Sequence, residues 1–346
     1  MDTATNSSIR VLMFPWLAYS HIHPFLELAK KLSKRNFCIY LCSTPANLAC
    51  IKEKEPSVEF VELHLPSLPE LPPHSHTTKG LPRHLLSSLM KALDMSRRSF
   101  SEILGALKPD LLISDVLQPW APAKALSLNI PTVLFMRSNH VHGYDYENDD
   151  LTLQNRLLQS LEGSCNLMLI RSLRELEGKY VGELSVQAMK KIVLVGPLVQ
   201  ELSEEEDEKT EIMEWLDKKD PRSVLFVSFG SECYLSREDR EELAHGLQLS
   251  NVSFIWVIRF PDQGEKISFY KKLALLWKSK REQDGKLGRE EVAKVVREVV
   301  VEETGEQVRR KARELGERIK GKDDEEMDEV VRELVKLCGW EANKPL

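Results

Sequence analysis

The chain has 346 residues and a formal net charge of -6. Its 42% of hydrophobic residues can form well-packed cores, and its length favours two domains. The acidic balance provides no electrostatic basis for binding nucleic acid or an anionic membrane surface, so we expect neither as a partner.

Two features of the sequence bear on the compartment of the protein. Residues 1–8 contain no basic residue, and Pro15 interrupts the apolar run after them, so we expect neither a signal peptide nor a membrane span. The 6 cysteines are scattered, without a CxxC pair or a Cys/His cluster, which predicts reduced thiols and no metal site. Together these features predict a cytoplasmic protein.

Short apolar runs alternate with helical patterns along the first 200 residues or so of the chain. Most runs are followed by a longer amphipathic stretch, which is typical of βαβ units in an α/β fold. In a doubly wound sheet the strand order 3-2-1-4-5 is common. The runs expected to be buried parallel strands are residues 9–14, 37–42, 58–63, 111–113, 132–135, 167–170 and 192–195.

A polar segment that carries His21 and His23 follows the first expected strand. Helical spacing begins at residue 26, so we expect both histidines in the loop between strand and helix. Ligands of open parallel sheets bind beyond the carboxyl ends of the strands. His21 is therefore a candidate catalytic residue, although an unplaced loop histidine is more often an ordinary one.

Asp115 follows the fourth expected strand and strengthens the case for His21. In the order 3-2-1-4-5, strands one and four are neighbours at the switch point, so their loops face each other. An aspartate beside a histidine forms a general-base pair, because the carboxylate orients the imidazole and stabilises its protonated form. The sequence thus predicts a base that removes a proton from a hydroxyl group.

Composition divides the chain into two parts. The acidic run at residues 201–208 is too highly charged to pack, so we expect it to be solvated. We expect a first domain over residues 1–197, an acidic linker over 198–210 and a second domain over 211–346. The proline-rich residues 65–78 are expected to form an ordered surface loop over the crevice, with His74, His76 and His84 on the surface.

The second domain begins with an expected helix over residues 211–218 and a buried strand that ends in Gly230 and Ser231. Glycine lets the backbone approach a ligand, and a small hydroxyl beside N–H groups can hold a phosphate or sugar oxygen. Many strands end in Gly-Ser merely to turn, so this feature alone does not assign a ligand.

Several segments of the chain match one known family: residues 13–21 with 24–25, 41–45, 110–115 with 118–122, 171–177, 195–198 and 227–231. Together they resemble plant UDP-sugar-dependent glycosyltransferases, inverting enzymes of the GT-B type with two facing Rossmann-like domains. The N-terminal part is most similar to the branch that extends sugars already attached to a plant small molecule, such as the glucosyl crocetin 1,6-glucosyltransferases.

The resemblance implies a reaction and its partners. His21 would deprotonate an acceptor hydroxyl, Asp115 would balance the charge on His21, and the hydroxyl would displace UDP from the anomeric carbon with inversion. The donor would be a UDP-sugar, expected to be UDP-glucose, and the acceptor a plant glycoside. No metal or other cofactor is implied, and we expect a monomer.

The resemblance also implies binding positions. Gly230 and Ser231 match positions that contact the donor diphosphate. Trp16 and Trp120 are candidates to line the acceptor side, although a buried aromatic residue is more often part of a core. Ser20 stands where the family usually has glycine before the histidine.

The chain departs from the family after residue 260. There the family continues into a signature that reads roughly Trp-Ala-Pro-Gln, then His-Cys-Gly-Trp-Asn-Ser, then Asp/Glu-Gln, and that binds uracil, ribose, diphosphate and sugar. Here residues 261–280 lead directly to residues 284–292, which match the family's near-terminal helices. We therefore expect a truncated second domain, whether from a splice form, a gene-model error or an engineered deletion.

Two functions stay open at this point. One is a glycosyltransferase whose acceptor half and catalytic pair are intact, and the other is an impaired paralogue that binds a glycoside or a partner without turnover. A dehydrogenase is disfavoured because the first loop lacks a Gly-x-Gly-x-x-Gly sequence. In the family the last helix crosses back to the first domain, which residues 327–337 are expected to do here.

Overall fold

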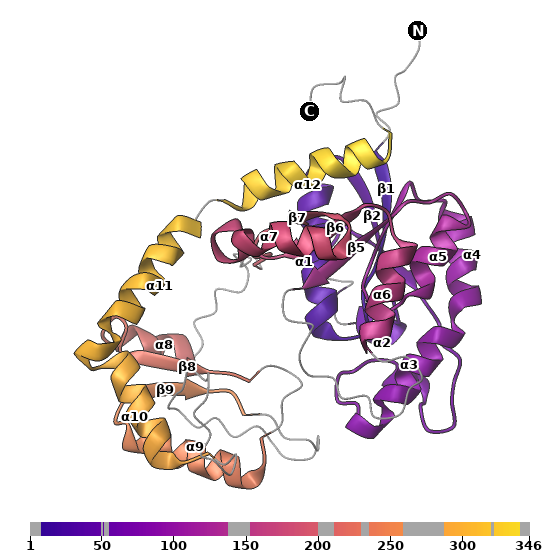
Figure 1. Ribbon diagram of the computed structural model, residues 1–346. Coiled ribbons are helices and arrows are strands. Elements are labelled where there is room, and N and C mark those ends of the chain that lie inside the picture. Colours follow the sequence, from indigo (N-terminus) through magenta and orange to yellow (C-terminus); the bar gives the residue numbers. More distant parts are fainter. Residues whose placement is uncertain are drawn as a thin grey trace. The chain divides into compact units, whose positions relative to one another are not determined.

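The computed structural model describes residues 8–49, 51, 55–137, 153–199, 211–229, 235–258, 287–319 and 322–339. The chain divides into two compact units, one of residues 1–200 with 319–346 and the other of residues 201–318. The main elements of the first unit (Figure 1) are β1 (Ile9–Phe14), α1 (Tyr19–Ser33), β2 (Phe37–Ser43), α2 (Pro45–Leu48), β3 (Glu59–Glu62), α3 (Leu86–Met95), α4 (Arg97–Leu107), β4 (Leu111–Ser114), α5 (Trp120–Leu126), β5 (Thr132–Arg137), α6 (Leu153–Gly163), β6 (Leu167–Arg171), α7 (Arg174–Ala188), β7 (Lys191–Leu194) and α12 (Asp323–Leu337).

Within the described residues, the strands of the first unit form one sheet in the order β3-β2-β1-β4-β5-β6-β7. Every neighbouring pair is parallel. A strand such as β4 is buried along its whole length, as expected for a parallel sheet covered on both faces. The predicted α/β fold and strand order are confirmed, and β6 and β7 extend the sheet beyond β5.

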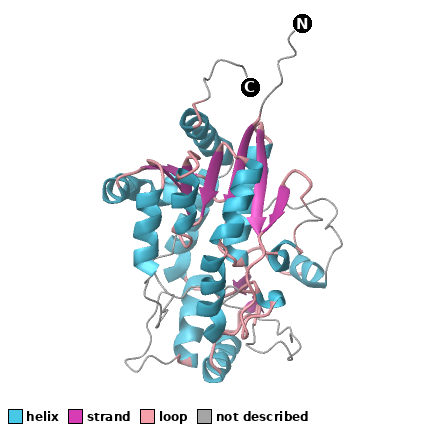
Figure 2. Cartoon of the chain, turned by 90° about the vertical axis from the view of Figure 1, so that its right-hand side faces the viewer, coloured by secondary structure: helices cyan, strands magenta, loops and turns pink. Residues whose placement is uncertain are grey.

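Each face of this sheet has its own apolar core, because successive side chains of a strand point to opposite faces. Val11 and Met13 of β1 belong to a cluster with residues of α1 and α12. Leu12 and Phe14 belong to a second cluster, with residues of α3, α4 and α5. Figure 2 shows helices on both sides of the strands. The alternating side chains of β1 therefore pack against the helices on both faces of the sheet.

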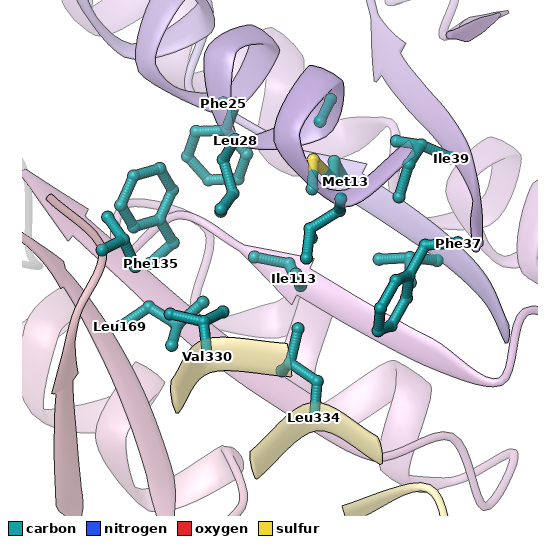
Figure 3. Packing of buried hydrophobic residues seen from close by; sticks show 14 of the residues in the cluster. Met13, Phe25, Leu28, Phe37, Ile39, Ile113, Phe135, Leu169, Val330 and Leu334 are labelled. Atoms are coloured by element: carbon teal, nitrogen blue, oxygen red, sulfur yellow. The ribbon is translucent and has the colours of Figure 1, made fainter. Parts of the chain in front are cut away.

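The helix α12 completes the first of these cores. Met327, Val330, Val331 and Leu334 recur at the spacing of one helical face and are buried. Figure 3 shows Val330 and Leu334 among the side chains of this cluster, together with Ile113 of β4. The expectation that the last helix joins the first domain is therefore confirmed.

Ion pairs add to the attachment of α12. Arg174 pairs with Glu329 at 2.8 Å, and Lys191 pairs with Glu333 at 2.8 Å. The expected second domain of residues 211–346 needs correction here, because α12 packs in the first unit. The physical reason is that its apolar stripe packs into the core cluster that also contains residues of β1, β4 and α1.

We expect that Leu334→Ala lowers the free energy of unfolding of the first unit by about 2–5 kcal/mol, because it leaves a cavity in a fully buried site. Arg332→Ala, on the exposed side of the same helix, should change it by less than about 0.5 kcal/mol. Urea denaturation of both variants measures the difference, and equal effects would show that α12 does not stabilise the first unit through this face.

The second unit contains α8 (Glu211–Asp217), β8 (Val224–Val227), α9 (Arg237–Leu249), β9 (Ser253–Trp256), α10 (Arg289–Val300) and α11 (Glu306–Ile319). Its described strands, β8 and β9, form a parallel pair that packs on α9 and α10. At Gly246 an added Cβ would lie 2.6 Å from the Cβ of Val292, so glycine permits the close packing of α10 on α9. This small sheet agrees with the truncation expected from the sequence.

Candidate active site

The candidate site lies where β1 and β4 end. These strands are parallel neighbours, and Phe14 is in register with Ser114, the last residue of β4. The Asp115 N–H donates to the Phe14 carbonyl at 3.1 Å, which extends the ladder by one residue. On one side of β1 the chain proceeds to β2 and on the other side lies β4, so this is the topological switch point of the sheet.

His21 lies in the first turn of α1, which corrects the expectation that it lies in the loop. The N–H groups of His21 and Ile22 both donate to the Ala18 carbonyl at 2.9 Å, so the helix begins at Tyr19. The expected helix began only where the helical spacing does, at residue 26, so Pro24 lay outside it. Pro24 lies inside α1, past its first turn, where a proline removes one N–H donor and its ring crowds the carbonyl four residues earlier. The start of α1 is therefore not set by the preference of this residue.

His21 and Asp115 form a short buried hydrogen bond. The distance from His21 Nδ1 to Asp115 Oδ2 is 2.6 Å, and the two side chains are 0% and 3% exposed. The Trp16 N–H donates to the same oxygen at 3.4 Å, and the Leu117 N–H donates to Oδ1 at 3.2 Å. The carboxylate is thus oriented by its own loop and by the segment after β1.

This geometry assigns different tasks to the two ring nitrogens of His21. With Nδ1–H donating to an ionised Asp115, Nε2 carries the lone pair that can accept a proton. The carboxylate would then stabilise the imidazolium that forms, without itself becoming protonated. The arrangement is chemically able to remove a proton from a hydroxyl group.

His23 has different surroundings, although it is only two residues away. Its Nε2 lies 3.8 Å from Glu27 Oε1, its side chain is 24% exposed, and its ring lies against that of Tyr19. Positions i and i+2 of a helix do not face the same direction. The structure therefore distinguishes two histidines that the sequence placed in one loop.

The end of the proline-rich stretch contacts the loops that follow β1 and β2. The Thr78 N–H donates to the Leu17 carbonyl at 3.1 Å, and Thr44 Oγ1 donates to the His76 carbonyl at 2.6 Å. The expectation that His76 is a surface residue is wrong, because it is 4% exposed. Burial lowers the pKa of His76, which keeps this ring neutral at pH 7.

Trp16 and Trp120 lie in the apolar core of the first unit, with 1% and 8% exposure. Trp120 packs against Phe14 and Phe100, with ring centroids 5.8 and 5.4 Å apart, and its Nε1 donates to Asp94 at 2.8 Å. These contacts account for both rings as core residues. Their acceptor-lining role stays a prediction.

The sequence did not single out several polar residues around Asp115. Ser160 Oγ of α6 donates to the Val116 carbonyl at 2.8 Å, and Arg156, one turn earlier, donates to the Leu117 carbonyl at 3.2 Å. The amide of Gln118 is buried without a hydrogen-bond partner in the described part of the chain. Arg156 and Ser160 stand four positions apart, each directly before a leucine of α6 (Leu157 and Leu161), and this spacing beside the apolar side of the helix is the signal that points to them.

The predicted donor residues Gly230 and Ser231 lie outside the described residues, as do residues 261–280. No group of three or more possible metal ligands occurs among the residues that are described. Within the same residues, no helix combines the length and apolar character needed to cross a membrane. Burial raises the pKa of the Cys42 thiol, which makes it unreactive.

The fold and site define a doubly wound α/β protein with a candidate general-base pair at its switch point. No protein-family profile matches the chain. Individual relatives do: mogroside IIIx synthase from Siraitia grosvenorii is 40% identical over 447 aligned residues, covering 96% of this chain and 94% of the relative. Beta-D-glucosyl crocetin beta-1,6-glucosyltransferase from Gardenia jasminoides is 32% identical, covering 94% and 98%. The chain belongs to the plant UDP-glycosyltransferase family, which confirms the predicted resemblance.

A solved structure supports the fold independently of sequence. Phytolacca americana UGT2, complexed with UDP-2fluoro-glucose and pterostilbene, has a TM-score of 0.72 at 19% identity, with coverage of 96% of this chain and 100% of that chain. The alignment with mogroside IIIx synthase spans about 100 positions more than this chain has residues. The chain is therefore shorter inside the aligned region, as the missing signature predicts.

Proposed function

We propose that this protein transfers glucose from UDP-glucose to a sugar hydroxyl of a plant glycoside, with His21 as the general base. The observation that carries the proposal is the buried 2.6 Å contact between His21 and Asp115 at the switch point. The names of two relatives, a mogroside synthase and a glucosyl crocetin glucosyltransferase, support a glycoside as the acceptor class.

The proposed reaction is a single displacement. His21 Nε2 takes the proton of the acceptor hydroxyl while the oxygen of that hydroxyl bonds to the anomeric carbon of glucose. The bond from that carbon to the UDP oxygen breaks on the opposite side, so UDP leaves and the configuration inverts. Asp115 stabilises the imidazolium, and no metal takes part in these steps.

We assign Gly230 and Ser231 to the donor diphosphate on the strength of the sequence resemblance alone. A glycine-serine turn after a parallel strand supplies N–H groups and a hydroxyl that suit phosphate oxygens. Trp16 and Trp120 remain proposed neighbours of the acceptor. The acceptor's own sugar would occupy the crevice beyond β1 and β4.

A second candidate is a glycoside-binding protein with little turnover. The observation that favours it is the shortened second unit, whose described strands are β8 and β9 alone. In this case the first unit would still bind the acceptor, because its sheet and its His21–Asp115 pair are complete.

A matched pair of acceptors tests the proposal. We expect UDP-glucose and a flavonoid or triterpene monoglucoside to yield a product heavier by one hexose, while the parent aglycone gives at least about tenfold less product, since a buried polar site rejects a ligand that lacks its hydroxyl groups. Mass spectrometry measures the product, and NMR of the new linkage tests inversion. Calorimetry that detects glycoside binding without any transfer would favour the second candidate. Equal use of aglycone and glucoside would contradict the acceptor class.

A further inference from the structure

The loop that follows β4 carries the carboxylate of the candidate pair. Asp115 contacts His21 through Oδ2 at 2.6 Å and accepts the Leu117 N–H through Oδ1 at 3.2 Å. Because the second bond comes from the loop backbone, a shift of residues 116–118 would turn the carboxylate. The direction of Asp115 therefore depends on what holds this backbone in place.

Two side chains of α6 hold it. Ser160 Oγ donates to the Val116 carbonyl at 2.8 Å, and Arg156 Nη1 donates to the Leu117 carbonyl at 3.2 Å. The two residues are 0% and 3% exposed and lie four positions apart, on one face of the helix. Each of the two carbonyls that follow Asp115 thus has a buried donor from the same element.

Arg156 is fixed in turn by Asp94 of α3. Its Nη2 donates to Asp94 Oδ2 at 2.7 Å and its Nη1 to Oδ1 at 3.3 Å, while Trp120 Nε1 donates to Oδ1 at 2.8 Å. A guanidinium has several N–H donors in one plane, so it can bind a carboxylate and a carbonyl at once, which a lysine ammonium cannot do in the same geometry. The network joins three helices to the Asp115 loop.

The cost of burying this network argues for a specific task. The Arg156 side chain is 4% exposed, and a buried ion pair is often no more stabilising than apolar residues of the same volume. If this network only filled the core, apolar residues could therefore take its place. What apolar residues cannot supply is a pair of directed hydrogen bonds to the carbonyls of the loop.

We propose that Arg156, held by Asp94, positions the Asp115 loop so that the carboxylate stays directed at His21. The inference rests on the proposed function, in which His21 is the base. Arg156 acts through Asp115, so it is a positioning residue and not a catalytic one. Its loss would free the Leu117 carbonyl and weaken the hydrogen bond between His21 and Asp115.

The test measures that hydrogen bond directly, in the full chain labelled with 15N at its histidine rings. We expect one ring N–H proton to be shifted downfield and protected from exchange with water, and to disappear in His21→Ala. In Arg156→Lys and in Ser160→Ala this proton should exchange at least about tenfold faster, through local opening of the loop. Cooperative thermal unfolding shows that each variant is folded. If Arg156→Lys does not fold, the exchange rate in Ser160→Ala tests the inference.

Arg10→Lys is a matched control at the other end of β4. Arg10 binds Asp110 and also donates to the Leu107 carbonyl at 3.3 Å, so it has the same kind of partners as Arg156. This substitution should leave the exchange rate of the His21 ring N–H proton unchanged. An equal effect in Arg10→Lys, no effect in Arg156→Lys and Ser160→Ala, or no protected proton in the unmodified protein would each overturn the inference.

The outcome separates this inference from the proposed function. Faster exchange in the α6 variants supports the positioning role even if His21→Ala transfers sugar normally, which would contradict only the assignment of His21 as base. Where transfer is measurable, Arg156→Lys should lower kcat at least about tenfold with little change in the acceptor KM, because orientation and not binding is lost.

Discussion

Replacing His21 with Ala is expected to lower the rate of sugar transfer by roughly a hundred- to ten-thousand-fold, the usual contribution of general-base catalysis. The reason is that His21 has a buried carboxylate partner, at 2.6 Å, that can stabilise it after it accepts a proton. Without the imidazole, the acceptor hydroxyl must lose its proton to water while it attacks. Initial rates with UDP-glucose and a saturating glucoside acceptor measure the loss.

His23→Ala is the matched control, since this residue lies in the same turn of α1 but contacts Glu27 instead of Asp115. We expect it to reduce transfer by less than about fivefold, which is far below the contribution of a general base. Rates should be compared in this chain and in a form whose second unit comes from a full-length relative, so that weak donor binding does not hide the effect. Equal losses in the two variants would show that the turn as a whole, and not one imidazole, is required.

The second large effect concerns the donor. We expect this chain to bind UDP-glucose with a Kd in the millimolar range or weaker, and to transfer sugar slowly. If Gly230 and Ser231 bind the donor as proposed, they would offer two or three hydrogen bonds, each worth about 0.5–1.5 kcal/mol net. Micromolar affinity requires about 8 kcal/mol, and about 4 kcal/mol corresponds to a millimolar Kd. The contacts that would supply the difference belong to the signature that is missing between residues 260 and 284.

Isothermal titration of the chain with UDP and with UDP-glucose tests this expectation. The form that carries the second unit of a full-length relative serves as the positive control. A micromolar Kd together with ordinary turnover in this chain would contradict the prediction. In that case residues 261–280 would have to contain a donor site of a new kind.

Much of the first unit was predictable from local pattern. Strands such as β1 and β4 are short and almost entirely apolar. Their composition alone therefore predicts that they are buried in a parallel sheet. The neighbourhood of His21 and Asp115 followed from strand order, because a doubly wound sheet brings the ends of its first and fourth strands together. The apolar stripe of α12 was also visible, as a face that needs a partner.

The sequence by itself determined the family, the parallel sheet and the two residues of the candidate pair, because motifs and apolar periodicity are local properties. Only the tertiary structure decided which ring nitrogen of His21 meets Asp115, that α1 begins before Pro24, and that His76 is buried. It also decided that Arg156 and Asp94, 62 positions apart, meet beneath the Asp115 loop. Such contacts depend on how α3 and α6 pack on the sheet. The periodicity of a segment shows which of its faces is buried, but not which distant residue that face meets.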